Sequence, residues 1–290
     1  MPTLIDLRRR IRSVRNSQQL TQAMKTVSMA KYRKAQRLVL EARPYWHIFP
    51  EIAALVASWA GEDAHPLLLK RRENKIEAVI ITSDKGLAGA FNANLLLQAQ
   101  AFIRERSEAS NIGLVLMGKK AVNFFKRSGL RVDRSFSKKI DKLDREEVKD
   151  LAEFLMRLYV LNRTDGVYII YNEFRSILSP RITAVRLLPV GFEKAVPGSP
   201  DVLADWEPEA RALIDSVLPL YVESQIHHAL FESQAAEQAA RMMAMDNATR
   251  NAGELISDLV LVLNKIRQAS ITKELLEIMT AVDALAKQAG

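Results

Sequence analysis

The stretch from Pro219 to Ala289 runs for about seventy residues with no further proline and with one glycine, Gly253. Alanine, leucine, methionine, glutamine and glutamate dominate it, and all five favour helix. Pro219 suits a first helical turn, where its missing N–H would have no partner. Such a helix would be roughly 100 Å long, whereas a compact globule of this chain length is about 50 Å across. We therefore expect a helix that extends beyond its own domain and is covered by something else.

The apolar pattern of this stretch indicates a coiled coil. Residues 255–263 are apolar nearly all round, which is typical of an enclosed helix. Small alanines between residues 235 and 252 would let a second helix approach closely. An ordinary amphipathic core helix is the alternative, but the length favours a long two-helix coiled coil. Towards the end, apolar residues step by four and three as in a heptad seam, at Ile271, Leu275, Ile278, Val282 and Leu285.

The partner helix is predicted at the N-terminus, over residues 3–58. An apolar stripe from Leu4 to Val56 follows near-helical spacing. Pro44 should kink this helix or mark a break in it. The helix should end near Gly61, and it should pair antiparallel with the C-terminal helix because the chain must return.

An α/β domain is predicted between the two helices. The pattern alternates strands and helices, which indicates a mostly parallel sheet covered on both faces. A short helix at 207–217 should lead back to the long one. The expected fold is thus a long antiparallel α-helical coiled coil with a Rossmann-like domain inserted between its helices, divided as 1–60, 75–190 and 207–290. The expected strands are 76–82, 112–117, 131–136, 167–171 and 182–188, and the expected helices are 89–107, 119–127 and 143–162.

Composition narrows the class of protein. No run is apolar and long enough to span a membrane, no secretory signal is evident, and the absence of cysteine excludes disulfides and thiolate sites. The net charge of the chain is +8. Residues 1–43 have a net charge of +9, so the remaining residues together have a net charge of −1. This basic arm suggests an acidic partner, such as nucleic acid, anionic lipid or acidic protein loops. A solvated helix face is the simpler interpretation.

No catalytic centre can be argued from the motifs. The turn Ser83–Gly89 joins a strand to a helix, but it lacks the spacing of a dinucleotide fingerprint, and no phosphate-binding P-loop occurs. His227 and His228 are adjacent on a helix and diverge, which is poor for metal binding. We therefore expect neither a cofactor nor a metal.

A belt of polar residues interrupts the apolar C-terminal helix. It would offer directional hydrogen bonds to a surrounding ring of protein, with an apolar segment beyond it that needs enclosure. Its members are Asn264, Arg267, Gln268, Ser270, Thr272 and Glu274.

These motifs resemble the gamma subunit of the rotary F-type ATP synthase. The similarity runs in order along the whole chain and is carried by residues 7–14, 21–27, 82–89, 237–249 and 264–274. The resemblance implies a noncatalytic central rotor stalk, present once per proton-driven complex, which transmits rotation from a membrane ring to a catalytic hexamer and regulates ATPase activity and ion flow.

The resemblance also implies partners. The coiled coil would stand inside three alpha and three beta subunits, and the α/β domain would bind the epsilon subunit and the c-ring. The chain would then lie at the cytoplasmic face of the bacterial inner membrane and contact that membrane only through its partners.

Residue roles follow from the resemblance too. Contacts to beta would come from Arg267, Gln268, Thr272, Met24, Lys25, Arg33 and Lys34. The residues enclosed by the hexamer would be Ile271, Leu275, Ile278, Val282 and Leu285. Trp206 and Glu207 would lie near epsilon and the ring.

The chain departs from many relatives at Ala88, where they have cysteine, and it has no cysteine-bearing regulatory insert.

Two other hypotheses stand beside the rotor. One is a nucleic-acid-binding coiled-coil protein, whose affinity would fall steeply as the salt concentration rises. Because the basic arm has few aromatic residues between its charges, we expect no nucleic-acid partner. The other is a nucleotide-dependent enzyme.

Overall fold

The computed structural model describes residues 3–60, 65–107, 109–136, 145–177, 180–191 and 210–288. The chain forms two compact units, residues 1–27 with 242–290 (the terminal unit) and residues 28–241 (the central unit). Helices α1 (Leu4–Ala60) and α5 (Ala210–Gln288) contribute to both units. Because the unit boundary falls inside both helices, the three-part division made from sequence stays a prediction. None of the described helices is long and apolar enough to cross a membrane.

The two long helices pair antiparallel in each unit. In the terminal unit Lys25 of α1 contacts Asp246 of α5, and Thr21 contacts Thr249. In the central unit the rings of Phe49 and Tyr221 are 6.1 Å apart, and the ring of Trp46 stacks on His228 at 4.3 Å. Since residue numbers rise along one helix as they fall along the other, the predicted antiparallel coiled coil is confirmed.

The central unit contains one five-stranded sheet, in the order β3-β2-β1-β4-β5. Strands β3, β2, β1 and β4 are mutually parallel, and β5 runs antiparallel to β4. The mostly parallel sheet expected from sequence is therefore confirmed. The strands are β1 (Lys75–Ile81), β2 (Asn111–Met117), β3 (Arg131–Phe136), β4 (Gly166–Glu173) and β5 (Arg181–Leu188).

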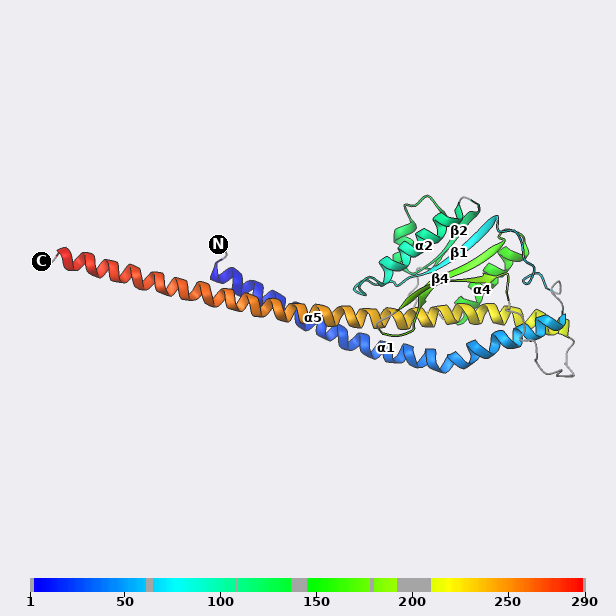
Figure 1. Cartoon of the computed structure of the whole chain (residues 1–290), viewed down its shortest axis with the longest axis horizontal. Coiled ribbons are helices and arrows are strands. Elements are labelled where there is room, and N and C mark those ends of the chain that lie inside the picture. The colour runs from blue at the N-terminus through cyan, green and yellow to red at the C-terminus, as the bar shows by residue number, and fades with distance from the viewer. Residues whose placement is uncertain are drawn as a thin grey trace. The chain divides into compact units, whose positions relative to one another are not determined.

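Helices cover both faces of this sheet (Figure 1). Helices α2 (Phe91–Ser107) and α3 (Lys119–Phe125) pack on the face that carries Ile80 and Leu116. Helix α4 (Arg145–Val160) and α5 pack on the face that carries Val79 and Val115. The alternation follows from the two-residue period of a strand. Because both faces are buried, the central strands are apolar almost throughout, as parallel sheets require.

One helix boundary was predicted wrongly. The described part of the predicted short helix, residues 210–217, and the long helix from Pro219 are one helix, α5, with Pro219 inside it. Helix α1 continues through Pro44 and Pro50, so of the two outcomes expected at Pro44, a kink or a break, the break is wrong. A proline in a helix removes one backbone hydrogen bond, and packing offsets that cost: Leu218 and Val222 are fully buried around Pro219.

Gly118 lies in the turn between β2 and α3, where a side chain would be both strained and crowded. Its φ is +92°, and an added Cβ would lie 2.3 Å from the backbone oxygen of Thr82. We expect Gly118→Ala to lower the free energy of unfolding by about 3 kcal/mol or more, because backbone must move. Chemical denaturation of the full chain measures this.

Gly129→Ala is the matched control, since Gly129 also has a positive φ, +72°, but has open space around it. It should cost only about 1–2 kcal/mol. Equal losses in the two variants would show that crowding at Thr82 has no effect.

Candidate functional site

The terminal unit has a small apolar core near the start of α1. Leu7, Ile11 and Leu259 are at most 9% exposed, and Val260 and Leu263 pack against them. The basic side chains Arg8, Arg9 and Arg10 between the buried positions are exposed. This stretch of α1 therefore packs its apolar side chains against α5, and its arginines face solvent.

A polar layer follows, further along α1. Lys25 Nζ donates to Asp246 Oδ1 at 2.6 Å, and the two side chains are each 28% exposed. This hydrogen bond holds the pKa of Asp246 below its usual range. The hydroxyls of Thr21 and Thr249 are 2.8 Å apart, and Gln18 Nε2 donates to the Thr249 carbonyl. Polar pairs within a coiled coil fix the register of its helices.

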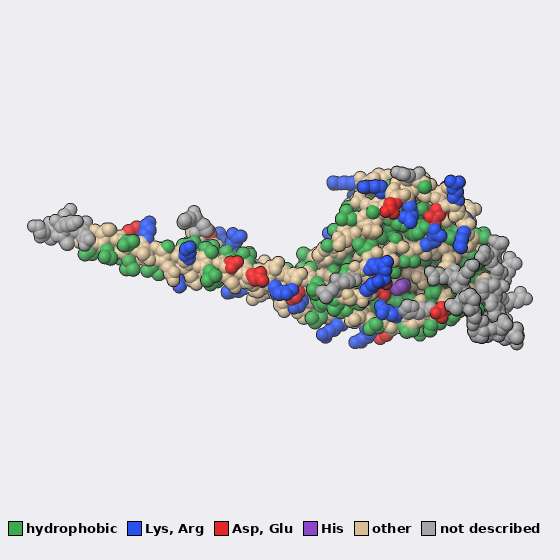
Figure 2. All heavy atoms as spheres, in the orientation of Figure 1, with side chains coloured by type: hydrophobic (Ala, Val, Ile, Leu, Met, Phe, Trp, Pro, Cys, Tyr) green, Lys and Arg blue, Asp and Glu red, His purple; other side chains and the backbone are tan. Residues whose placement is uncertain are grey.

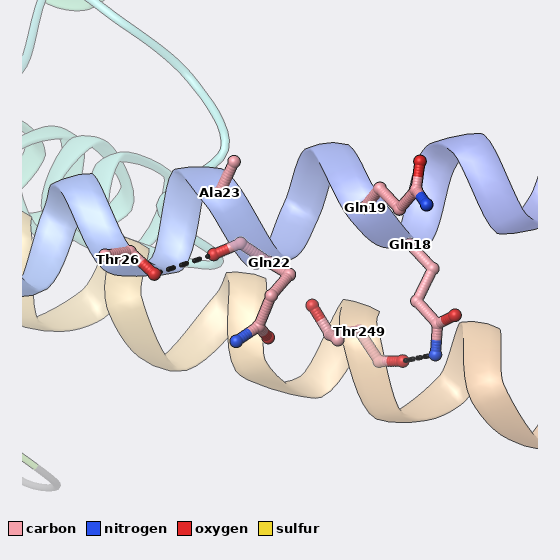
Figure 3. Close-up of a pocket in the computed structure, with 6 residues that line it drawn as sticks. All are labelled: Gln18, Gln19, Gln22, Ala23, Thr26 and Thr249. Carbon is pink, nitrogen blue, oxygen red and sulfur yellow. Dashed lines mark hydrogen bonds between the residues drawn. The ribbon is translucent and has the colours of Figure 1, made fainter.

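Beside this layer lies a hollow of about 520 Å³, lined by Gln18, Gln19, Gln22, Ala23, Thr26 and Thr249. In Figure 3 the Gln18 side chain reaches across to Thr249, while Gln19 points away from α5. Amides and hydroxyls of this kind supply hydrogen bonds in both directions without charge. The hollow can therefore receive polar groups of another protein chain, and its lining offers no group for catalysis.

The C-terminal part of α5 exposes apolar side chains (Figure 2). Between Arg267 and Val282 only Ser270 is even partly buried. We call residues 271–282 the apolar end segment. Its large apolar side chains are 50–65% exposed: Ile271, Leu275, Leu276, Ile278, Met279 and Val282. The side chain of Leu285 lies outside the described residues.

Most of the predicted polar belt is also exposed, whereas Asn264 and Ser270 are half-buried. Arg267, Gln268 and Thr272 face solvent, and the Thr272 hydroxyl donates to the Gln268 carbonyl of the same helix. On α1, Met24 and Lys25 are half-buried. The structure therefore brings Arg267, Gln268 and Thr272 together, and it gives Lys25 a partner within the chain.

In the central unit the predicted basic pair Arg33 and Lys34 is exposed on α1, next to buried Tyr32 and Ala35. The pair is thus directed outward from the helix contact. Trp206 and Glu207 lie outside the described residues.

The turn Ser83–Gly89 is held by α5 rather than left open for phosphate. Arg241 donates through Nε and Nη2 to the Gly86 carbonyl at 3.3 and 3.2 Å. Glu237, one turn earlier on α5, pairs with Arg241 at 2.7 Å. Phosphate binding requires donors, whereas this turn presents carbonyl acceptors to an arginine. The turn is a docking element between the sheet and α5.

The two adjacent histidines also have structural surroundings. His227 lies 3.8 Å from Glu223, and His228 lies 3.6 Å from buried Glu232. Burial lowers the pKa of His227, and Glu223 partly opposes this. Glu232 also accepts a hydrogen bond from the Phe174 backbone N–H at 2.8 Å. These groups fasten α5 to α1 and to the end of β4.

The fold and these surfaces define a class of protein. It is a two-helix coiled coil made from both ends of one chain, with an α/β domain inserted, and its distinctive surfaces are apolar, polar or basic faces of helices. Such surfaces serve assembly with other chains.

Comparison with known proteins identifies the family. A profile of the family described as ATP synthase matches residues 3–285. The ATP synthase gamma chain of Pelotomaculum thermopropionicum is 40% identical over 285 residues, which covers 98% of this chain and 100% of that one. That of Solibacter usitatus is 44% identical over 289 residues, with 98% and 99% covered. The chain belongs to the family of ATP synthase gamma chains.

Solved structures share the fold. A chain of the Euglena gracilis mitochondrial ATP synthase, in a structure of OSCP, F1 and c-ring, has a TM-score of 0.66 at 20% identity and covers 97% of this chain and 94% of its own length. A chain of the Tetrahymena thermophila central stalk and c-ring has a TM-score of 0.59 at 22% identity, with 79% and 99% covered.

Sequence reasoning missed three features of the structure. It assigned no role to Arg241 and no partner within the chain to Lys25. It also passed over Glu77, a fully buried acid within β1. An acidic residue inside an otherwise apolar strand was a usable signal for Glu77, whereas the partners of Arg241 and Lys25 depend on long-range contacts.

Proposed function

We propose that this chain is the noncatalytic central rotor stalk of a proton-driven ATP synthase. It transmits rotation from a membrane ring to a catalytic hexamer of alpha and beta subunits, and it regulates ATPase activity and ion flow. The membership in the gamma chain family supports this function.

The observation that carries the proposal is the apolar end segment. Six large apolar side chains at least half exposed on one helix are costly in water, so they require a cover from other chains. In the proposed complex, Ile271, Leu275, Ile278, Val282 and Leu285 lie within a sleeve formed by three alpha and three beta subunits, with one copy of this chain.

The contacts with beta follow from the exposed polar groups. Arg267, Gln268 and Thr272 form hydrogen bonds with a beta loop just before the sleeve. Arg33 and Lys34 face acidic beta loops. Met24 contributes its exposed edge, and Lys25 shares its charge between Asp246 and beta.

The other end of the complex involves the membrane ring. The α/β domain binds the epsilon subunit and the c-ring, with Trp206 and Glu207 near them. The chain lies peripherally at the cytoplasmic face of the bacterial inner membrane and reaches the membrane through its partners.

Direct observation of rotation tests this function. The chain has no native cysteine, so a single Lys126→Cys variant, at an exposed position, carries a probe on the α/β domain. In an immobilised complex with alpha and beta we expect ATP-driven rotation of the probe in one direction. A probe that stays fixed while the complex hydrolyses ATP would refute the rotor function.

A further inference from the structure

Arg241 is a buried charge that connects two parts of the central unit. It lies on α5, is 7% exposed, and points at the turn that follows β1. Its guanidinium reaches the carbonyls of both Gly86 and Lys85, the latter at 3.5 Å. Glu237 balances its charge and orients it. A planar arginine fork with several donors gives such a contact a defined direction, which a lysine cannot reproduce.

The turn is itself fixed to the α/β domain. The Ser83 backbone N–H donates to Asn92 Oδ1 of α2 at 3.0 Å, and the Ser83 hydroxyl donates to the Lys85 carbonyl at 2.7 Å. Asp84 Oδ1 accepts the Lys119 backbone N–H at the start of α3. Leu87 and Gly89 have φ of 63° and 57°. The carbonyl groups of Lys85 and Gly86 are therefore held in place by hydrogen bonds to the α/β domain.

The rest of this contact is apolar, with small alanines on the side of α5 and the ring of Phe91 on the side of the turn. Ala88 and Phe91 share a buried cluster with Ala235, Ala236 and Ala239 of α5. Apolar burial is non-directional, so alanines hold the turn close to α5 but resist rotation of the helix only weakly. Arg241 is also the last residue of the central unit on α5, which continues without interruption to Gln288.

From this arrangement we propose that Arg241, oriented by Glu237, is a positioning residue through which the α/β domain transmits torque to α5. The inference rests on the proposed rotor function and assigns the transmission to one side chain. Directional hydrogen bonds at this point keep the helix from turning against the domain that drives it.

The test uses the complete ATP synthase in inverted membrane vesicles. Three quantities are measured on the same vesicles: ATP hydrolysis, ATP-driven proton uptake, and hydrogen exchange in peptides covering residues 83–91. The variants are Arg241→Gln, Arg241→Lys and the double variant Arg241→Gln/Glu237→Gln, which avoids leaving the Glu237 charge without Arg241. Arg250→Gln is the control, because Arg250 pairs with Asp246 four residues earlier but is exposed.

We expect Arg241→Gln and the double variant to lose proton uptake severalfold per ATP hydrolysed. Exchange in the turn should rise about tenfold or more, since a hydrogen bond to a charged group is worth at least that factor. Arg241→Lys should recover part of the uptake, because its ammonium can still pair with Glu237. The control should match the unaltered complex in all three measurements.

Unchanged proton uptake per ATP in the Arg241 variants would overturn the inference, whether or not exchange in the turn rises. If Arg241→Gln fails to assemble, the lysine variant decides in the same way. A lack of pumping or rotation in the unaltered complex would instead refute the proposed function, so the two failures are distinguishable.

Discussion

Replacing Leu275, Ile278 and Val282 together by glutamine is expected to make the isolated chain less prone to self-association and to weaken its assembly with alpha and beta subunits. These side chains are 57–60% exposed in the chain alone. Covering each fully contributes roughly 1 kcal/mol or more, because about half of its area is still in water. The triple variant would therefore lose on the order of 3–5 kcal/mol of gross association energy. Glutamine keeps helix propensity high, so α5 itself should persist.

Two measurements separate these effects. Sedimentation of the isolated chain reports self-association, and co-purification with alpha and beta over a range of dilutions reports assembly. The matched control replaces the charged neighbours Lys273 and Glu277, which pair with each other on the same exposed segment, by glutamine. It should leave both properties nearly unchanged. A triple variant that assembles as tightly as the unaltered chain would show that the apolar end segment is not enclosed by partners.

The sequence was informative where the pattern is local and repetitive. Alternating apolar strands and amphipathic helices between residues 75 and 190 predicted all five strands within a few residues. The long helix at the end followed from its lack of proline and glycine. Both rest on hydrophobic periodicity, which a chain displays without knowledge of its contacts.

The sequence was uninformative where a distant contact overrides a local preference. Pro219 favours a helix start, yet it lies inside the continuous helix α5, and Pro44 does not break α1. The pairing of Lys25 with Asp246, 221 residues away, does not follow from the sequence, and the contact of Lys25 with a beta subunit stays a prediction. The role of Arg241 depends on a turn 155 residues earlier in the chain. The spacing of residues along the sequence does not predict contacts between residues so far apart.

Raising the pH from 7 to 9.5 is expected to destabilise the central unit through one buried carboxyl group. Glu77 is 0% exposed on β1, and neither of its oxygens has a hydrogen-bond partner among the described residues. Gly113 opposite it on β2 has no side chain, and Arg131 Nη2 lies 3.5 Å away, paired with Asp133. Burial, reinforced by Asp133 and opposed by Arg131, raises the pKa of Glu77 to about 8.

The direction of the pH effect follows from linkage. Glu77 has a higher pKa in the folded chain than in the unfolded chain, so the folded state binds the proton more tightly. Its contribution to stability is complete below the unfolded pKa of 4.5 and is lost as pH rises through about 8. Burial lowers the pKa of His65 and His227, so their contribution is lost on the acid side, as pH falls below 6.5. Burial raises the pKa of Tyr221 above its ordinary value of 10.0.

Glu77→Gln isolates this group, because glutamine has nearly the same shape and does not titrate. We expect the free energy of unfolding of the unaltered chain to fall by about 1.4 kcal/mol between pH 7 and 9.5, which corresponds to the roughly one pH unit between 7 and the pKa of Glu77. In the variant the loss should be small, so the two chains should diverge with rising pH. Chemical denaturation of the full chain, followed by circular dichroism, measures both. Glu153→Gln, which removes an exposed carboxylate beside Lys149, should keep the slope of the unaltered chain. If Glu77→Gln keeps that slope as well, then Glu77 is already ionised at pH 7, and Arg131 stabilises its charge despite the burial.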